Sequence, residues 1–209
     1  MAEELIPRRR ADEHLPAECM ADYERAQHNL CVVTSCSYNE SNPSGETVQM
    51  AASFFVLTFR IGGIACGIRA DRVREILPIA ATLQTPGQPS ILAGFLNLRG
   101  VGLPIVRLAT VLDLTERISL NSAIIVIEGQ SSPGLLVDAV DDVIEVGSDD
   151  LRAVGSDQSM NGCAKAEFSI DNGNAILLDC DRLLLAEETR RMAELQGSVQ
   201  RRLSKLEAV

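Results

Sequence analysis

The chain has few of the residues on which catalysis usually depends. Of its 209 residues only two are histidine, His14 and His28, and only two are lysine, Lys165 and Lys205. A Ser-His-Asp or Cys-His arrangement is therefore impossible after residue 50. Phosphate-binding loops of the G-x-x-x-x-G-K-[ST] and G-x-G-x-x-G kinds are also missing. We expect no enzymatic activity, no catalytic residue and no cofactor.

Aromatic residues, positive charge and long apolar runs are scarce as well. Aromatics make up 3% of the chain, so the core must be aliphatic, and the net charge of −10 argues against a nucleic-acid partner. The apolar runs are too short to cross a bilayer, and the first residues lack the apolar run of a signal peptide. We expect a cytoplasmic protein with no membrane insertion. Its cysteines should then be reduced, with Cys66, Cys163 and Cys180 as small core residues.

Short apolar segments separated by turn residues dominate the chain after residue 53. Turn signals at 62–63, 99–100, 129–134 and 171–173 predict four hairpins. The expected strands are 54–61, 64–68, a hairpin over 91–108, then 123–128, 135–140, 143–146, 165–170 and 174–179. Asp71 is expected to cap one helical turn that ends near Arg74. Many short strands with close turns favour small β-barrels over a parallel α/β sheet.

Five of these segments resemble, in order, the motifs of the CheW-like domain, the adaptor module of bacterial chemosensory arrays. The most specific match is the sequence NLRG at 97–100, followed by LPIV at 103–106. The other matches are FVLTF at 55–59, GI at 67–68 with VREI at 73–76, GLLVD at 134–138 and AILLD at 175–179. Together they cover about residues 54 to 185.

The resemblance implies a mainly β fold, with two small five-stranded SH3-like β-barrels packed as one domain over residues 51–185. Residues 1–50 carry nine acids against four arginines and read as a flexible acidic leader. Residues 186–209 are predicted to form an amphipathic α-helix. Its apolar stripe consists of Met192, Leu195, Val199, Leu203 and Leu206. That helix either docks on the barrels or protrudes to pair with a partner helix.

The resemblance also implies a non-catalytic adaptor function. Such adaptors couple the cytoplasmic tips of chemoreceptors to the regulatory domain of a CheA-type sensor histidine kinase, at membrane-associated receptor arrays. Carried over by position, the partner-binding surface consists of Val73, Glu75, Gly94, Asn97, Arg99, Gly100 and Arg107.

Several of these residues fit a structural role equally well. Val73 fits a core position, and Gly94 fits a backbone turn. Glu75 and Arg99 fit an internal ion pair as well as a direct contact. Arg107 stands where the family usually has Asp, so it reflects either drift at a solvated position or a changed choice of partner. Together with Cys66 at a usually aromatic position and the long leader, Arg107 leaves two pathways open. The chain is either a main chemotaxis adaptor or equally an adaptor of a divergent chemosensory pathway, such as one controlling pili, biofilm or a second messenger.

An alternative function starts from Cys19, His28, Cys31 and Cys36 in the leader. These are zinc-ligand residue types, but their spacing, C-x8-H-x2-C-x4-C, lacks a paired C-x2-C knuckle. We therefore assign no metal site. The cluster leaves open a regulatory module that binds a small ligand or a metal through this segment.

Overall fold

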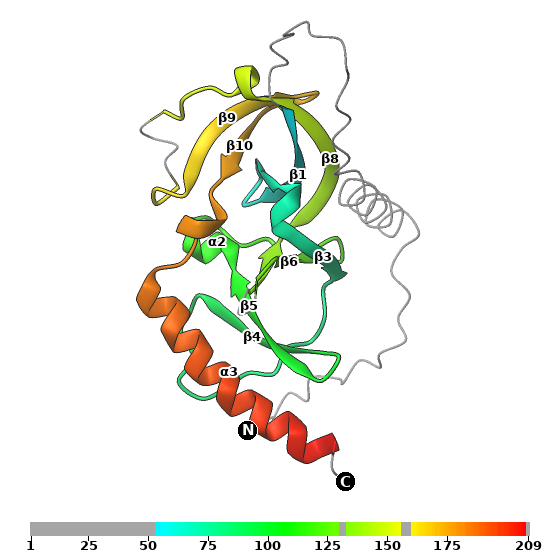
Figure 1. Ribbon diagram of the computed structural model, residues 1–209, viewed down its shortest axis with the longest axis vertical. Helices are drawn as coiled ribbons and strands as arrows, with labels where there is room; N and C mark the ends of the chain where they lie inside the picture. The colour runs from blue at the N-terminus through cyan, green and yellow to red at the C-terminus, as the bar shows by residue number, and fades with distance from the viewer. Residues whose placement is uncertain (1–52, 130–132, 156–159, 208–209) are drawn as a thin grey trace, which may run out of the picture.

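The computed structural model describes residues 53–129, 133–155 and 160–207, and its strands form two five-stranded sheets (Figure 1). Sheet A has the order β8-β1-β2-β10-β9, with β1 (Ser53–Ile61), β2 (Ile64–Arg69), β8 (Ala139–Gly147), β9 (Ala164–Ile170) and β10 (Gly173–Leu178). Sheet B has the order β3-β6-β7-β5-β4, with β3 (Val73–Pro78), β4 (Leu92–Leu98), β5 (Val101–Arg107), β6 (Ala123–Ile127) and β7 (Gly134–Val137). The helices are η1 (Ala70–Arg72), α2 (Leu108–Val111), η2 (Ser148–Asp150), η4 (Cys180–Arg182) and α3 (Ala186–Glu207).

This architecture confirms the predicted mainly β fold with a C-terminal helix. Closure of each sheet into an SH3-like barrel stays a prediction. The acidic leader, with Cys19, His28, Cys31 and Cys36, lies outside the described residues. None of the described helices is long and apolar enough to cross a membrane.

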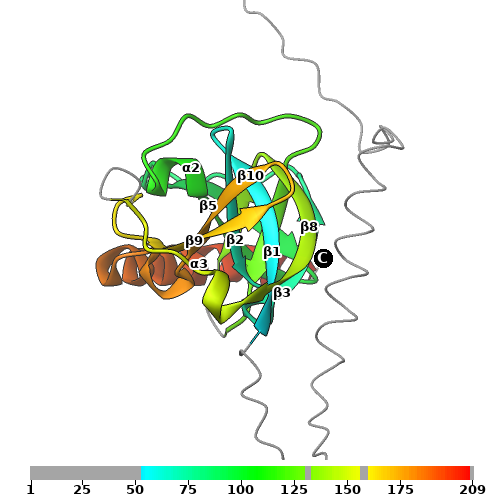
Figure 2. The same cartoon turned by 90° about the horizontal axis from the view of Figure 1, so that it is seen from above.

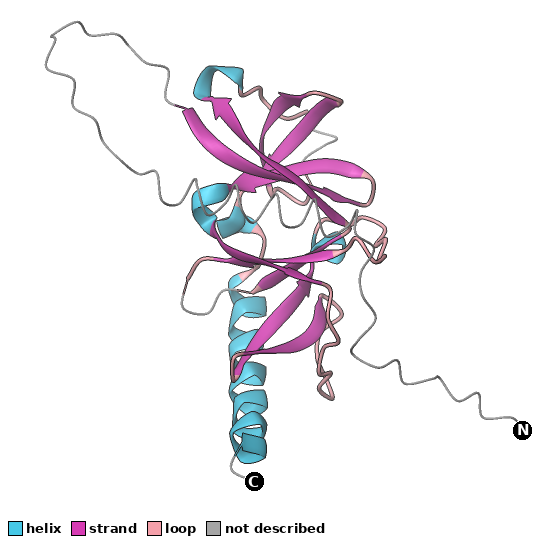
Figure 3. Cartoon of the chain, turned by 90° about the vertical axis from the view of Figure 1, so that its right-hand side faces the viewer, coloured by secondary structure: helices cyan, strands magenta, loops and turns pink. Residues whose placement is uncertain are grey.

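Sheet B is inserted in sequence into sheet A. Its five strands follow one another along the chain between β2 and β8, both of which belong to sheet A. Each sheet contains one parallel pair, β2 with β10 and β5 with β7, and its other pairs are antiparallel. The two sheets stack along the long axis of the molecule, and α3 lies along sheet B (Figures 1 and 3). Seen from above, the loop after α2 runs along one side of the molecule (Figure 2).

Several strands are apolar throughout because both of their faces are buried. In β6 all five residues are buried. Ile124 and Val126 belong to a small cluster made by sheet B alone, whereas Ile125 and Ile127 belong to the large cluster that contains residues of both sheets. Alternate residues of one strand therefore fill two different cores, as the two-residue period of a strand requires.

Two local predictions need correction. Asp71 lies inside η1 and caps nothing; its carboxylate instead pairs with Arg69 at 2.6 Å. The segment after η1 is the strand β3, which the sequence did not predict as a strand. The predicted strands 135–140 and 143–146 are in fact β7 and the nine-residue β8, which runs through Asp141 and Asp142.

Helix α3 docks on sheet B, which supports the first of its two predicted arrangements. Met192, Val199 and Leu203 are buried, and Leu195 is half-buried against the same cluster. The helix packs against β5 and β4. The side chain of Leu206 lies outside the described residues.

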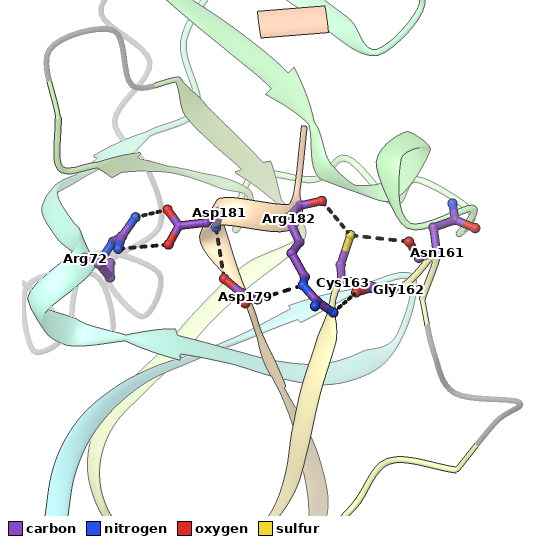
Figure 4. Close-up of polar contacts among 7 residues, drawn as sticks. All are labelled: Arg72, Asn161, Gly162, Cys163, Asp179, Asp181 and Arg182. Atoms are coloured by element: carbon purple, nitrogen blue, oxygen red, sulfur yellow. Dashed lines mark hydrogen bonds and ion pairs between the residues drawn. The ribbon is translucent and has the colours of Figure 1, made fainter. Parts of the chain in front are cut away.

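Side-chain contacts fix the segments that cross between the sheets. The carboxylate of Asp138, between β7 and β8, accepts hydrogen bonds from the main-chain N–H of Gly62 at 2.7 Å and of Arg117 at 3.2 Å. Arg72 in η1 forms an ion pair with Asp181 in η4 (Figure 4). Because η1 leads from sheet A to sheet B and η4 leads from sheet A to α3, this pair joins two separate crossings.

Candidate partner-binding site

The hairpin of β4 and β5 presents the centre of the candidate site at its two-residue turn. Arg99 and Gly100 both have positive φ, 53° and 83°, which is the signature of a type I′ hairpin turn. The Asn97 Oδ1 atom accepts a hydrogen bond from the Gly100 N–H at 2.9 Å. Asn97 and Gly100 therefore shape the turn, and Arg99 is its exposed side chain, with 86% of its surface accessible.

Glu75 on β3 lies within reach of this turn. Its Oε2 is 3.9 Å from an Arg99 guanidinium nitrogen, and its Oε1 is 3.0 Å from that of Arg74. Because β3 and β4 are the two edge strands of sheet B, this proximity requires the sheet to curl. The predicted Glu75–Arg99 ion pair is thus present only at the outer limit of distance. Arg74 is the nearer partner of the carboxylate.

Two predicted contact residues have structural roles. Val73 is 4% exposed and belongs to the large core cluster. Gly94 lies inside β4 at a register irregularity, with φ of 137°, and not at a turn as expected. A Cβ atom on Gly94 would lie 2.8 Å from the Leu83 carbonyl oxygen and from the Thr82 hydroxyl. The close approach of the 82–83 segment to β4 therefore requires glycine.

Arg107 lies at the other end of β5, six residues or roughly 20 Å of strand from Val101, the first residue after the turn. Its Nη1 atom forms an ion pair of 2.5 Å with Oε2 of Glu116. The structure thus brings Glu75, Asn97, Arg99 and Gly100 together, and it places Arg107 in a separate internal contact.

The sequence analysis missed Gln200. This α3 side chain hydrogen-bonds to the main chain of Gly100 and Gly102. No local signal could have identified it, because the contact spans about one hundred residues.

The site offers binding groups and no reactive ones. Among the described residues, no group of three or more His, Cys, Asp or Glu is placed to hold a metal ion. Burial raises the pKa of the Cys66 thiol to about 12 and that of the Cys180 thiol to about 11. Both thiols keep their protons at neutral pH and are poor nucleophiles. What the hairpin provides is a rigid main chain that carries an exposed cation.

Comparison with known proteins gives the same assignment as the hairpin motif. The family described as "CheW-like domain" matches residues 56–188, well over half of the chain. The chain belongs to the CheW-like domain family. Its CheW-like domain thus begins within β1 and ends within the first turn of α3.

The chain is similar to curated CheW proteins over most of their length. It is 30% identical over 144 residues to the chemotaxis protein CheW of Rhizobium meliloti, and the aligned region covers 64% of this chain and 88% of that protein. It is 25% identical over 132 residues to the chemotaxis protein CheW of Thermotoga maritima, covering 63% and 87%. The crystal structure of the scaffolding protein TtCheW from Thermoanaerobacter tengcongensis matches with a TM-score of 0.56 at 22% identity, over 61% of this chain and 90% of that one. This last likeness shows a shared fold.

These matches support a scaffold or adaptor role in chemotaxis signalling. CheW-like proteins are non-catalytic scaffolds, which agrees with the expectation that the chain is not an enzyme.

Proposed function

We propose that this CheW-like protein is an adaptor of a bacterial chemosensory array. In this role it binds the cytoplasmic tip of chemoreceptors and the regulatory domain of a CheA-type sensor histidine kinase, and it couples the two in the cytoplasm beneath the membrane. Family membership supports the class of function, and the β4–β5 hairpin supplies the surface.

One observation carries the proposal, namely the exposure of Arg99 on an ordered turn. The Arg99 side chain is 86% accessible, and the nearest carboxylate among the described residues, that of Glu75, is 3.9 Å away. The guanidinium is therefore free to pair with an acidic group of a partner. The main chain beneath it is held on both sides by β4 and β5. Little ordering of this turn is then needed when a partner binds.

The experiment compares Arg99→Glu with Arg152→Glu, which makes the same charge change beside β9 of sheet A. Affinities for a receptor cytoplasmic fragment and for the kinase regulatory domain are measured by calorimetry. We expect Arg99→Glu to weaken binding to at least one partner by about ten-fold or more, as loss of a central arginine contact does. Arg152→Glu should bind as the parent does. Equal affinities for both variants and the parent would contradict the proposal.

We further propose that the array belongs to a divergent pathway, as the departures at Arg107 and Cys66 and the long leader suggest. The same calorimetry with kinase regulatory domains from the main and the divergent pathways of one cell tests this. Tighter binding to the main-chemotaxis kinase would refute it.

A further inference from the structure

Helix α3 holds the turn that carries Arg99. The Gln200 side-chain amide donates a hydrogen bond to the Gly100 carbonyl oxygen at 2.7 Å and accepts one from the Gly102 N–H at 3.0 Å. One side chain therefore fixes two main-chain groups of the hairpin, on either side of Val101. Both bonds are partly buried.

Packing between α3 and β5 makes this contact possible. Val199 and Leu203, which flank Gln200 on the helix, are buried against sheet B. A Cβ atom at Gly102 would lie 3.1 Å from Val199 Cγ1, so the absence of a side chain there lets the helix approach β5 closely. The Gln200 amide then lies at hydrogen-bond distance from the main chain of the turn.

The direction of the Arg99 side chain depends on that main chain. The side chain is 86% accessible, and its one ion-pair partner among the described residues is Glu75, at 3.9 Å. Its backbone has positive φ, a conformation that is costly for a residue other than glycine and persists only where the surroundings hold it. The groups that hold it are the Asn97 amide within the hairpin and the Gln200 amide from α3.

We propose that Gln200 is a positioning residue for partner binding, and that α3 is thereby a working part of the binding site. This rests on the proposed role of the Arg99 turn in binding. Gln200 itself touches no partner. It fixes the conformation in which Arg99 is presented.

The test uses the full chain with Gln200→Leu, which keeps the bulk and removes both hydrogen bonds. Gln200→Glu keeps the acceptor for Gly102 and loses the donor for Gly100. Gln196→Ala, a half-buried glutamine one turn earlier on α3, is the matched control. We expect Gln200→Leu to weaken partner binding roughly five- to ten-fold, as the loss of two hydrogen bonds implies. Gln200→Glu should lie in between, and Gln196→Ala should be neutral. Amide exchange at Gly102 should accelerate in Gln200→Leu, which loses the acceptor, and not in Gln196→Ala.

A second arm separates positioning from general stabilisation. In an Arg99→Ala background, Gln200→Leu should cause no further loss of affinity, because the residue being positioned is gone. The same loss in both backgrounds would overturn the inference, and so would faster exchange at Gly102 with unchanged affinity. If Arg99→Ala binds as tightly as the parent, the proposed function itself fails and the inference falls with it.

Discussion

Arg107 on β5 and Glu116, in the loop after α2, form an ion pair in which both side chains are about three-quarters buried, with 28% and 26% of their surfaces exposed. The Nη1–Oε2 distance is 2.5 Å, while Oε1 of Glu116 is buried without a hydrogen-bond partner among the described residues. The positive charge at position 107 therefore has a use inside the chain. A requirement for Arg107 can arise from Glu116 alone, without a partner protein.

The first prediction follows from this pair. Arg107→Asp should lower the free energy of unfolding by roughly 1–3 kcal/mol, because it leaves the largely buried Glu116 carboxylate opposite a like charge. Combining it with Glu116→Arg should recover part of the loss, since the charges are then exchanged. Urea unfolding of the parent, the two single variants and the double variant measures this coupling. If Arg107→Asp keeps its stability and instead changes which kinase is bound, Arg107 acts on the partner.

The second prediction concerns Gly94, with Gly173 as its control. Both have positive φ, 137° and 129°, but nothing lies within 4 Å of a Cβ placed on Gly173. Alanine at 173 should destabilise through backbone strain alone, by about 1–3 kcal/mol. Alanine at 94 should cost roughly 1–3 kcal/mol more, because it also collides with the Leu83 carbonyl. Equal losses by thermal unfolding would mean that the 82–83 segment moves aside freely.

The third prediction is a stabilising change in α3. Gly197 lies within the helix and is exposed, and a Cβ placed on it would meet no atom within 4 Å beyond its chain neighbours and the adjacent helix backbone. Gly197→Ala should raise the free energy of unfolding by about 0.5–1 kcal/mol, because glycine loses more backbone entropy in a helix. Unchanged stability by urea unfolding would indicate that α3 frays beyond residue 197 in solution.

The fourth prediction is a loss of stability at alkaline pH that depends on Cys66. Burial raises the pKa of its thiol to about 12, above the value of about 8.5 for an exposed cysteine. The unfolded chain therefore loses this proton first. The contribution of the buried Cys66 thiol to the free energy of unfolding is complete below about pH 8.5. It is lost as the pH rises toward 12, by about 1.4 kcal/mol per pH unit.

Urea unfolding between about pH 8 and pH 10.5 measures that slope, and Cys66→Ala is the comparison. The variant should be less stable at about pH 8 because of the cavity, but its stability should fall less steeply with pH. Parallel curves for the two proteins would show that the thiol ionises as readily in the folded state.

The local parts of this fold were predictable from the sequence, and the non-local parts were not. The hairpins at 62–63, 99–100 and 171–173 follow from residues that favour positive φ, and each turn acts on its own neighbours. The parallel pairing of β2 with β10 joins Cys66 to Ile176, and no local pattern encodes it.

The strand β3 escaped prediction and β8 was predicted only in part, because irregularities interrupt their patterns. A register shift between Val73 and Glu75 breaks the alternation of β3. In β8 the acidic pair at 141–142 interrupts the apolar run, but the Thr58 hydroxyl donates to the Asp142 carbonyl and accepts from its N–H, at 2.8 and 3.1 Å. That hydroxyl carries the ladder across a bulge in β8, where Asp141 and Asp142 both lie opposite Thr58, through a contact between residues 84 positions apart.

In the candidate site, too, the local contacts were predictable from the sequence and the non-local ones were not. Asn97, Arg99 and Gly100 were identified from the hairpin motif, and the structure brings them together. The interpretation of Arg107 needed Glu116, and that of the turn needed Gln200. Both partners lie in other elements.

The insertion of sheet B into sheet A sets the order in which a nascent chain can fold. All strands of sheet B leave the ribosome before any of β8, β9 or β10. The β1–β2 hairpin is made first, but β10, its partner on the β2 side, follows about 100 residues later, or roughly 5–20 s at ordinary rates of synthesis. The β1 edge lacks its strand until β8 is made, and the β2 edge lacks its strand throughout that interval, so the hairpin can pair with another chain. Aggregation during synthesis should therefore begin at β1 and β2, and ribosome-bound chains that stop between residues 137 and 173 are the species most exposed to it.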